Sequence, residues 1–301
     1  MRQFGAFKKA LAISTLVAGM GLFIGPGAYA GGNVVLTGHD DDLHQSTAAK
    51  AQALGMLNFA RQGSTLPVLT FDHGTELTTL MTALGIPFTN VDPNAGVPAA
   101  SLFNNSTFSA IAVASDTSCG GCDNNATSST NLAAASGAIA TFFNNGGGIV
   151  AFAGASNTSY YNFLPASATN PGIVSCSTCF TQTSAGVSAG VPAVNGDFPH
   201  NFFNFPGVGG MSPSWVAFET YTGSSTLGNL TNQPFTVGIA NGTIGGGTIT
   251  GGGGGGETGG GTVPEPASVV LLASGLAGLA TWRLKRKDYR VCRSISDARA
   301  A

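Results

Sequence analysis

Short segments made up wholly of apolar residues recur along the first half of the chain, with helical segments between them. Residues 110–114 and 149–153, for example, contain no polar side chain. A strand without a polar side must be buried on both faces, which is typical of parallel sheets covered by helices on both sides. The sequence therefore predicts an α/β fold, a three-layer sandwich around a mostly parallel sheet.

The predicted elements alternate in a regular way. We expect strands at residues 33–37, 66–71, 88–91, 110–114 and 149–153, and helices at residues 46–62, 75–84 and 131–144. Ser46 is a suitable N-cap for the first helix, and Gly85 is placed to end the second one. The apolar face predicted for the first helix consists of Ala49, Ala53, Met56, Leu57 and Ala60.

The regular alternation stops after residue 156. Residues 156–211 are rich in Ser, Asn, Pro and Gly, and later strands are expected only at 215–220 and 235–240. We interpret this half as a loop-rich continuation of the same domain that adds an antiparallel edge. A separate small β-domain is the alternative.

Residues 142–155 read FFNNGGGIVAFAGA, a helix that ends in glycines and leads into a strand. With the order of elements over residues 33–160, this stretch resembles class I glutamine amidotransferase-like and flavodoxin-like domains. The resemblance implies a Rossmann/flavodoxin-like sheet. It also implies, for glutamine hydrolysis, a cysteine nucleophile at a strand-to-helix turn, completed by His and Glu. The matching turn, residues 153–156, offers only Ser156, so we expect the fold without this activity.

The first 30 residues have the three parts of a secretory signal peptide. Arg2, Lys8 and Lys9 form the positive region, and residues 10–24 form the apolar region. Ala28 and Ala30 are small residues at the two positions that a signal peptidase reads, which predicts cleavage before Gly31. The expected partners are the Sec export machinery and signal peptidase. A first transmembrane helix is the alternative.

The segment between the two ends has an unusual charge balance. Residues 31–262 contain eight Asp and three Glu but only Lys50 and Arg61 as basic residues, a formal charge of −9. Such a surface repels nucleic acid, so we expect no nucleic-acid partner. The exported α/β domain is predicted to span residues 31–244, and the mostly glycine segment 245–262 to be a flexible linker.

Residues 263–287 combine three features in a fixed order. Val263, Pro264, Glu265 and Pro266 precede the apolar segment 267–282, which is followed by the basic cluster Arg283, Lys285, Arg286 and Lys287. A helix of 16 residues is about 24 Å long, less than the hydrocarbon core of about 30 Å. The basic cluster is expected to stay in the cytoplasm together with residues 288–301.

These three features resemble the PEP-CTERM sorting signal. The resemblance implies that an exosortase removes the tail from a transient inner-membrane intermediate. It also implies release to the cell surface or extracellular matrix of a Gram-negative bacterium. An ordinary C-terminal transmembrane anchor is the alternative.

Ionisable residues follow the predicted strands at the edge where open α/β sheets bind ligands. His39 and Asp40 follow the first strand and are the first candidates for a ligand or metal site; Asp72 and His73 follow the second. Asp116 follows the fourth strand. Imidazole and carboxylate together suit a divalent cation, and a His–Asp pair can also perform acid–base chemistry. Asp in such loops also serves as a helix cap, so a structural role is the alternative.

Four cysteines form two Cys-x-x-Cys motifs, Cys119/Cys122 and Cys176/Cys179. In an exported domain, two disulfides are expected, either within or between the motifs. A four-cysteine zinc site is the alternative, although the motifs are far apart for a compact zinc ribbon.

Three hypotheses for function follow. The first is an exported, exosortase-sorted surface or matrix protein whose amidotransferase-like domain is non-catalytic. The second is a metal-dependent hydrolase-like enzyme that uses the His and Asp residues at the strand ends. The third is a matrix protein that binds extracellular polysaccharide through its aromatic residues.

Overall fold

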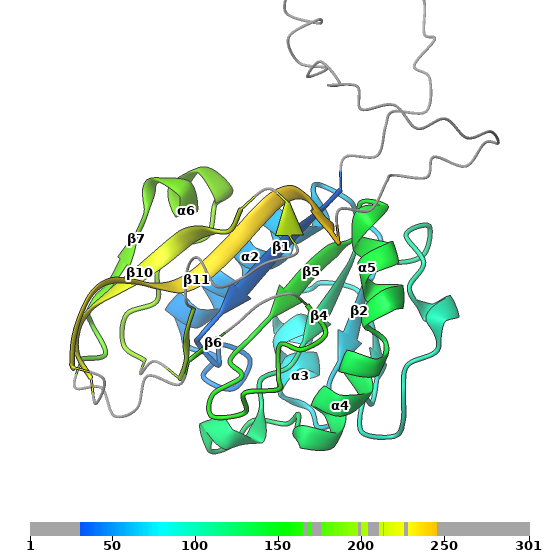
Figure 1. Cartoon of the computed structure of the whole chain (residues 1–301), viewed down its shortest axis with the longest axis horizontal. Helices are drawn as coiled ribbons and strands as arrows, with labels where there is room; N and C mark the ends of the chain where they lie inside the picture. Colours follow the sequence, from blue (N-terminus) through cyan, green and yellow to red (C-terminus); the bar gives the residue numbers. More distant parts are fainter. Residues whose placement is uncertain are drawn as a thin grey trace, which may run out of the picture. The chain divides into compact units, whose positions relative to one another are not determined.

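Five short strands form the parallel centre of the sheet, at the positions of the apolar segments (Figure 1). They are β1 (Gly32–Thr37), β2 (Val68–Phe71), β3 (Phe88–Val91), β4 (Ala110–Val113) and β5 (Gly148–Ala151). Every residue of β1, β2, β4 and β5 is buried, whereas the edge strand β3 is partly exposed. The computed structural model describes residues 31–164, 168–169, 176–197, 200–203, 211–212, 214–225 and 228–245.

The strand order of this parallel part is β3-β2-β4-β5-β1. β1 therefore pairs with β5, and the connection from β1 to β2 passes over β5 and β4. Flavodoxin-like sheets have the order 2-1-3-4-5 and Rossmann sheets 3-2-1-4-5-6, with the first two strands adjacent. The mixed α/β class with a parallel centre is confirmed, but the expected Rossmann/flavodoxin-like strand order is wrong.

The second half of the chain continues the same sheet in antiparallel fashion. β11 (Gly228–Ile244) pairs with β1, β10 (Val216–Ser225) with β11, and β7 (Phe180–Gln182) with β10. In this register Thr37 of β1 lies opposite Thr236 of β11. The predicted antiparallel edge is confirmed. The short strand β9 (Met211–Ser212) also pairs with β11, and β6 (Ala168–Thr169) pairs with β8 (Phe202–Phe203) apart from the main sheet.

Helices cover both faces of the sheet (Figure 1). α2 (Thr47–Arg61) and α3 (Glu76–Ala83) pack on one face, and α4 (Ala126–Ala134) and α5 (Ser136–Asn144) on the other. The short helix α6 (Ser184–Ala189) lies beside β10, and 3-10 turns occur at Ala100–Leu102 and Thr117–Cys119. The sheet thus separates two apolar cores, as expected for strands that are apolar on both sides.

The ends of α2 and α3 follow the sequence signals. The Ser46 side chain accepts a hydrogen bond from the backbone N–H of Ala49, which caps α2, and the predicted apolar face of this helix is buried. Gly85 follows α3 with a φ of 65°, the left-handed conformation that glycine adopts without strain. Both predictions are confirmed.

The helix predicted at residues 131–144 is two helices with a break at Ala135. The backbone N–H of Ala138 donates to Ala135 O, three residues back, whereas a regular α-helical bond spans four residues. Ser136 and Gly137 come directly after the break, and a Ser/Gly pair is a common site of helix kinks. The turn brings Leu132 and Ile139 onto the same core.

The predicted signal peptide, most of the predicted glycine-rich linker, the sorting signal and the predicted cytoplasmic tail lie outside the described residues. The apolar segment 267–282 is part of that region. Among the described residues, no helix has both the length and the apolar character needed to span a bilayer.

Candidate functional site

The loop after β1 is unusual because four consecutive ionisable residues, His39 to Asp42, are fully buried there. Asp42 fixes the loop to the end of β4, because its carboxylate accepts hydrogen bonds from the backbone N–H (2.7 Å) and hydroxyl (2.6 Å) of Ser115. Burial raises the pKa of Asp42 to about 7, although the two bonds from Ser115 act in the opposite direction. The loop is therefore rigidly placed and rich in carboxylates.

His39 forms a buried ion pair with Glu219 of β10. Its Nε2 lies 3.3 Å from the Glu219 carboxylate, and both side chains are 0% exposed. The ring packs between Phe180 and Phe235, with centroids 4.7 and 4.4 Å away. Burial by itself would lower the pKa of His39, but the attraction of Glu219, with help from Asp197, raises it to about 10. The pair is thus charged at neutral pH.

Glu219 is the centre of a hydrogen-bond network that joins the two halves of the chain. Its carboxylate accepts bonds from Gln52 of α2 (3.0 Å), Thr236 of β11 (2.6 Å) and the backbone N–H of Val194 (2.8 Å). These donors compensate for removing the charge from water. Sequence reasoning did not select Glu219. The sequence does contain a signal for Glu219, because it lies between the apolar residues 215–218 and an aromatic residue at 221. A Glu in a buried strand requires a partner.

A second group lies at the rim of the same loop and consists of Asp40, His44, Asp197 and His200. His44 Nδ1 is 3.1 Å from Asp40 Oδ1 and 2.9 Å from Asp197 Oδ1, and His200 Nε2 is 3.2 Å from Asp40 Oδ1. One ligand atom from each residue lies within 4.8 Å of all the others. The Asp40 side chain is 0% exposed and that of His44 is 52% exposed, so the group reaches from the interior to the surface.

Local backbone structure brings these four side chains together. The backbone N–H groups of Leu43 and His44 both donate to Asp40 O at 2.9 Å. This turn brings the His44 side chain next to the Asp40 carboxylate. His200 N donates to Gly38 O at 3.1 Å, which holds the second segment against the end of β1. A Cβ on Gly38 would lie 2.0 Å from Asn201 O, so only glycine permits this close approach.

Several buried polar atoms around this loop lack a hydrogen bond. They include both carboxylate oxygens of Asp41. Burial is the main cause that raises the pKa of Asp41 well above its ordinary value, and nearby carboxylates add to it. Attraction to Asp40 and Asp197 raises the pKa of the His44 imidazole despite its partial burial, which acts to lower it. Residues 39–44 thus contain three Asp side chains but only two His side chains.

The other predicted candidates, Asp72, His73 and Asp116, lie outside this group. Asp72 accepts bonds from the backbone N–H of Gly74 (3.0 Å) and Thr78 (3.1 Å) at the start of α3, and its pKa is raised to about 6, chiefly by burial. His73 is exposed and lies 3.0 Å from Asp92.

Asp116 accepts bonds from the backbone N–H and hydroxyl of Ser118, which cap the 3-10 turn Thr117–Cys119. Of the five predicted residues, only His39 and Asp40 lie at this loop. His39 contacts Asp197 and Glu219, and Asp40 contacts His44 and His200. The sequence did not connect these four partners to them.

The cysteines form one disulfide within each motif. Cys119 pairs with Cys122 and Cys176 with Cys179, with Cα–Cα distances of 6.0 and 5.6 Å. The expectation of two disulfides is confirmed, in its within-motif form. Sγ of Cys122 also lies 3.6 Å from Oδ2 of Asp40, so the first disulfide borders the rim group.

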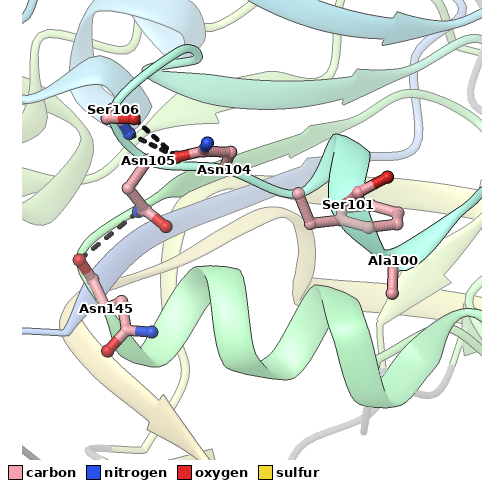
Figure 2. Close-up of a pocket in the computed structure, with 7 residues that line it drawn as sticks. Ala100, Ser101, Asn104, Asn105, Ser106 and Asn145 are labelled. Atoms are coloured by element: carbon pink, nitrogen blue, oxygen red, sulfur yellow. Dashed lines mark hydrogen bonds between the residues drawn. The ribbon is translucent and has the colours of Figure 1, made fainter.

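A surface cavity of about 680 Å³ lies away from this site (Figure 2). Its lining includes Ser101, Asn104, Asn105 and Asn145, which lie before the amino ends of β4 and β5. These side-chain amides already have protein partners: Asn104 accepts hydrogen bonds from Ser106, and Asn105 donates one to Asn145 O. The cavity has no ionisable group, and we give it less weight than the carboxyl ends of the strands.

Comparison with known proteins assigns one segment of the chain. Residues 262–287 match the family model of the PEP-CTERM protein-sorting motif. The chain therefore carries the signal of an exosortase-sorted protein, with exosortase as its processing partner. The motif indicates export to the cell surface of a Gram-negative bacterium. No curated protein and no solved structure matches the chain. The resemblance of residues 33–160 to amidotransferase-like and flavodoxin-like domains thus gains no support from relatives.

Proposed function

We propose that this chain is an exosortase substrate whose exported domain, residues 31–244, serves at the cell surface or in the extracellular matrix without catalysing a reaction. The match of residues 262–287 to the sorting motif carries the proposal. The Sec machinery first exports the chain, and signal peptidase then recognises Ala28 and Ala30. The apolar segment 267–282 then holds a transient inner-membrane intermediate until exosortase removes the tail.

The turn after β5 supports the absence of glutamine hydrolysis. Ala155 has a φ of 46°, in the left-handed region that residues other than glycine seldom adopt. The side chain there is a methyl group. Ser156 is exposed, and its backbone N–H bonds to Ser118. Nothing at this turn supplies an activated nucleophile.

The burial of His39 argues against the alternative of a hydrolase that uses His39 and Asp40 for acid–base chemistry. A general base must come within hydrogen-bond reach of the substrate. His39 is 0% exposed, covered by Phe180 and Phe235, and charged through its pair with Glu219. It is suited to hold the loop in place, not to exchange a proton with a substrate.

The aromatic residues proposed as a polysaccharide platform are largely buried. The described ones, Tyr160, Tyr161, Phe202, Phe203, Trp215 and Phe218, are each at most 8% exposed. They contribute area to the core. Extracellular polysaccharide as a partner would have to be bound by other groups of the uncharged polar surface.

The sorting step is tested by replacing Pro264, Glu265 and Pro266 with alanine in the native host. The wild-type chain should appear at the surface in a shortened form, whereas the variant should remain full-length in the inner membrane. Glu257→Ala, in the glycine-rich linker outside the motif, is the matched control and should be processed normally. Equal processing of all three chains, measured by membrane fractionation and mass spectrometry of the C-terminus, would disprove exosortase sorting.

A further inference from the structure

We propose that Asp40, His44, Asp197 and His200 form a binding site for one divalent transition-metal ion of the zinc class. The site belongs to the exported domain and does not depend on the sorting signal. The four ligands come from two parts of the chain: Asp40 and His44 follow β1, and Asp197 and His200 precede β8.

The spacing of the donor atoms fits one small ion. Ligand atoms about 2.0–2.1 Å from a tetrahedral ion lie about 3.3–3.4 Å from each other. The measured separations are 3.1 and 3.2 Å from Asp40 Oδ1 to the two imidazoles, and 2.9 Å from His44 Nδ1 to Asp197 Oδ1. One donor atom from each of the four residues lies within 4.8 Å of the others, so small side-chain adjustments would place all four around one ion.

The burial of Asp40 supplies an independent reason for a cation. Its side chain is 0% exposed, and Oδ1 faces two imidazole nitrogens, His44 Nδ1 at 3.1 Å and His200 Nε2 at 3.2 Å. A buried carboxylate oxygen without a bond is costly unless it is paired or binds a metal. The ion pairs found for Asp40 are with histidines alone, and these are uncharged when they bind a metal.

The chemistry of the donors selects the class of ion. Two carboxylates and two neutral imidazoles balance a charge of +2 and leave a neutral site. Imidazole nitrogen suits Zn²⁺, Cu²⁺, Fe²⁺ and Ni²⁺, whereas Ca²⁺ and Mg²⁺ prefer oxygen ligands. Four ligands of types N and O in a compact group are most compatible with tetrahedral Zn²⁺.

The surroundings hold the ligands in position. Charged His39 has its Nδ1 3.8 Å from Asp197 Oδ2, so the buried ion pair with Glu219 also orients a ligand of the site. His200 is tied to Gly38 through its backbone N–H, and the neighbouring Asn201 accepts a bond from Gly154 N at 2.9 Å. These contacts make the site rigid before any ion binds.

A second possible ligand set shares Asp40 and consists of Asp40, Cys119 and Cys122. The two sulfur atoms are joined in a disulfide, so neither is a thiolate that could bind an ion. In the oxidised protein the histidine group is therefore the one that can be loaded. The experiment is performed without reductant for this reason.

The test is a zinc titration of the full chain, purified in detergent with both disulfides intact and stripped of metal with a chelator. All chains carry Cys292→Ser, which removes the fifth cysteine. We expect one Zn²⁺ per chain, measured by calorimetry and by competition with a coloured chelator. His44→Ala plus His200→Ala should weaken binding by more than 100-fold, beyond the roughly 10–100-fold cost of losing an outer-shell partner.

His73→Ala is the matched control, because it also removes a histidine that lies beside an Asp. It should leave zinc binding unchanged, and Ca²⁺ should not compete. If the double variant misfolds by circular dichroism, His44→Ala alone, at a half-exposed position, must still lower affinity at least 10-fold. The proposal is overturned if no stoichiometric zinc binds at micromolar concentration, or if His73→Ala weakens binding as much as the site variants.

Discussion

At the scale of single residues, Asp in the loops of this sheet has two different roles. Asp72 and Asp116 accept bonds from nearby backbone N–H groups, the capping role that Asp fills in many βα loops. Asp41, in contrast, is buried with two oxygens that no hydrogen bond satisfies, and Asp40 is buried with Oδ1 facing two imidazoles. Residue type and position after a strand are the same in both cases, so only the surroundings distinguish a cap from a ligand.

The buried ion pair between His39 and Glu219 makes a clear prediction. Glu219→Gln leaves the charged His39 without its main partner in an apolar pocket, and such a loss typically costs about 3–5 kcal/mol. We expect a decrease of that size in the free energy of unfolding, measured by urea denaturation at pH 7. Glu76→Gln, on the first turn of α3, should change stability by less than about 1 kcal/mol. Equal stability of the Glu219→Gln and wild-type proteins would show that the pair is not charged.

At the scale of elements, close approach between segments depends on particular glycines. Gly38 follows β1 directly, and residues 200 and 201 pack against its backbone. Gly137 of α5 has open space around its Cβ position. The same substitution should therefore have opposite effects at these two positions.

Gly38→Ala should destabilise the protein by at least about 2 kcal/mol, because the methyl group would meet Asn201 O and the Phe235 ring. It should also weaken zinc binding, since His200 would be displaced. Gly137→Ala should stabilise the protein by up to about 1 kcal/mol, because alanine is the better helix former. Thermal and urea unfolding of both variants measure these changes. A neutral Gly38→Ala would contradict the close packing of the two segments.

At the scale of the whole molecule, the antiparallel strands complete the parallel sheet. All described residues belong to one compact unit, Met1–Gly251. β11 covers the open side of β1, and Glu219 of β10 bonds to Gln52 of α2. The second half is thus part of the same core as the first.

A chain consisting of residues 31–164 should consequently fail to fold. Without β11 and Glu219, β1 becomes an apolar edge strand and His39 loses its partner. We expect no cooperative urea transition by circular dichroism for this piece, whereas the matched piece 31–245 should unfold in one cooperative step. Cooperative unfolding of residues 31–164 would show that the parallel part is an independent domain.

Prediction from sequence worked where the signal is local. The strands of the first half, the Ser46 cap and the Gly85 turn follow from residue patterns within about ten positions. The sorting motif is recognised by enzymes as a linear segment, so it can be read directly. The break at Ala135 was missed although Ser136 and Gly137, a pair common at helix kinks, come directly after it.

The sequence by itself determined the α/β class, the sorting motif and the two Cys-x-x-Cys motifs, since all of these depend on short-range periodicity or spacing, whereas the pairing of the cysteines came from the structure. Only the tertiary structure decided that β1 lies between β5 and β11, which brings residues 39–44 next to 197–200 and 219. The neighbours of β1 are chosen by contacts between segments more than 100 residues apart, and these contacts leave no local pattern in the chain. The physical reason is that buried charges gain their partners through long-range packing, so a site built from them exists only in the folded protein.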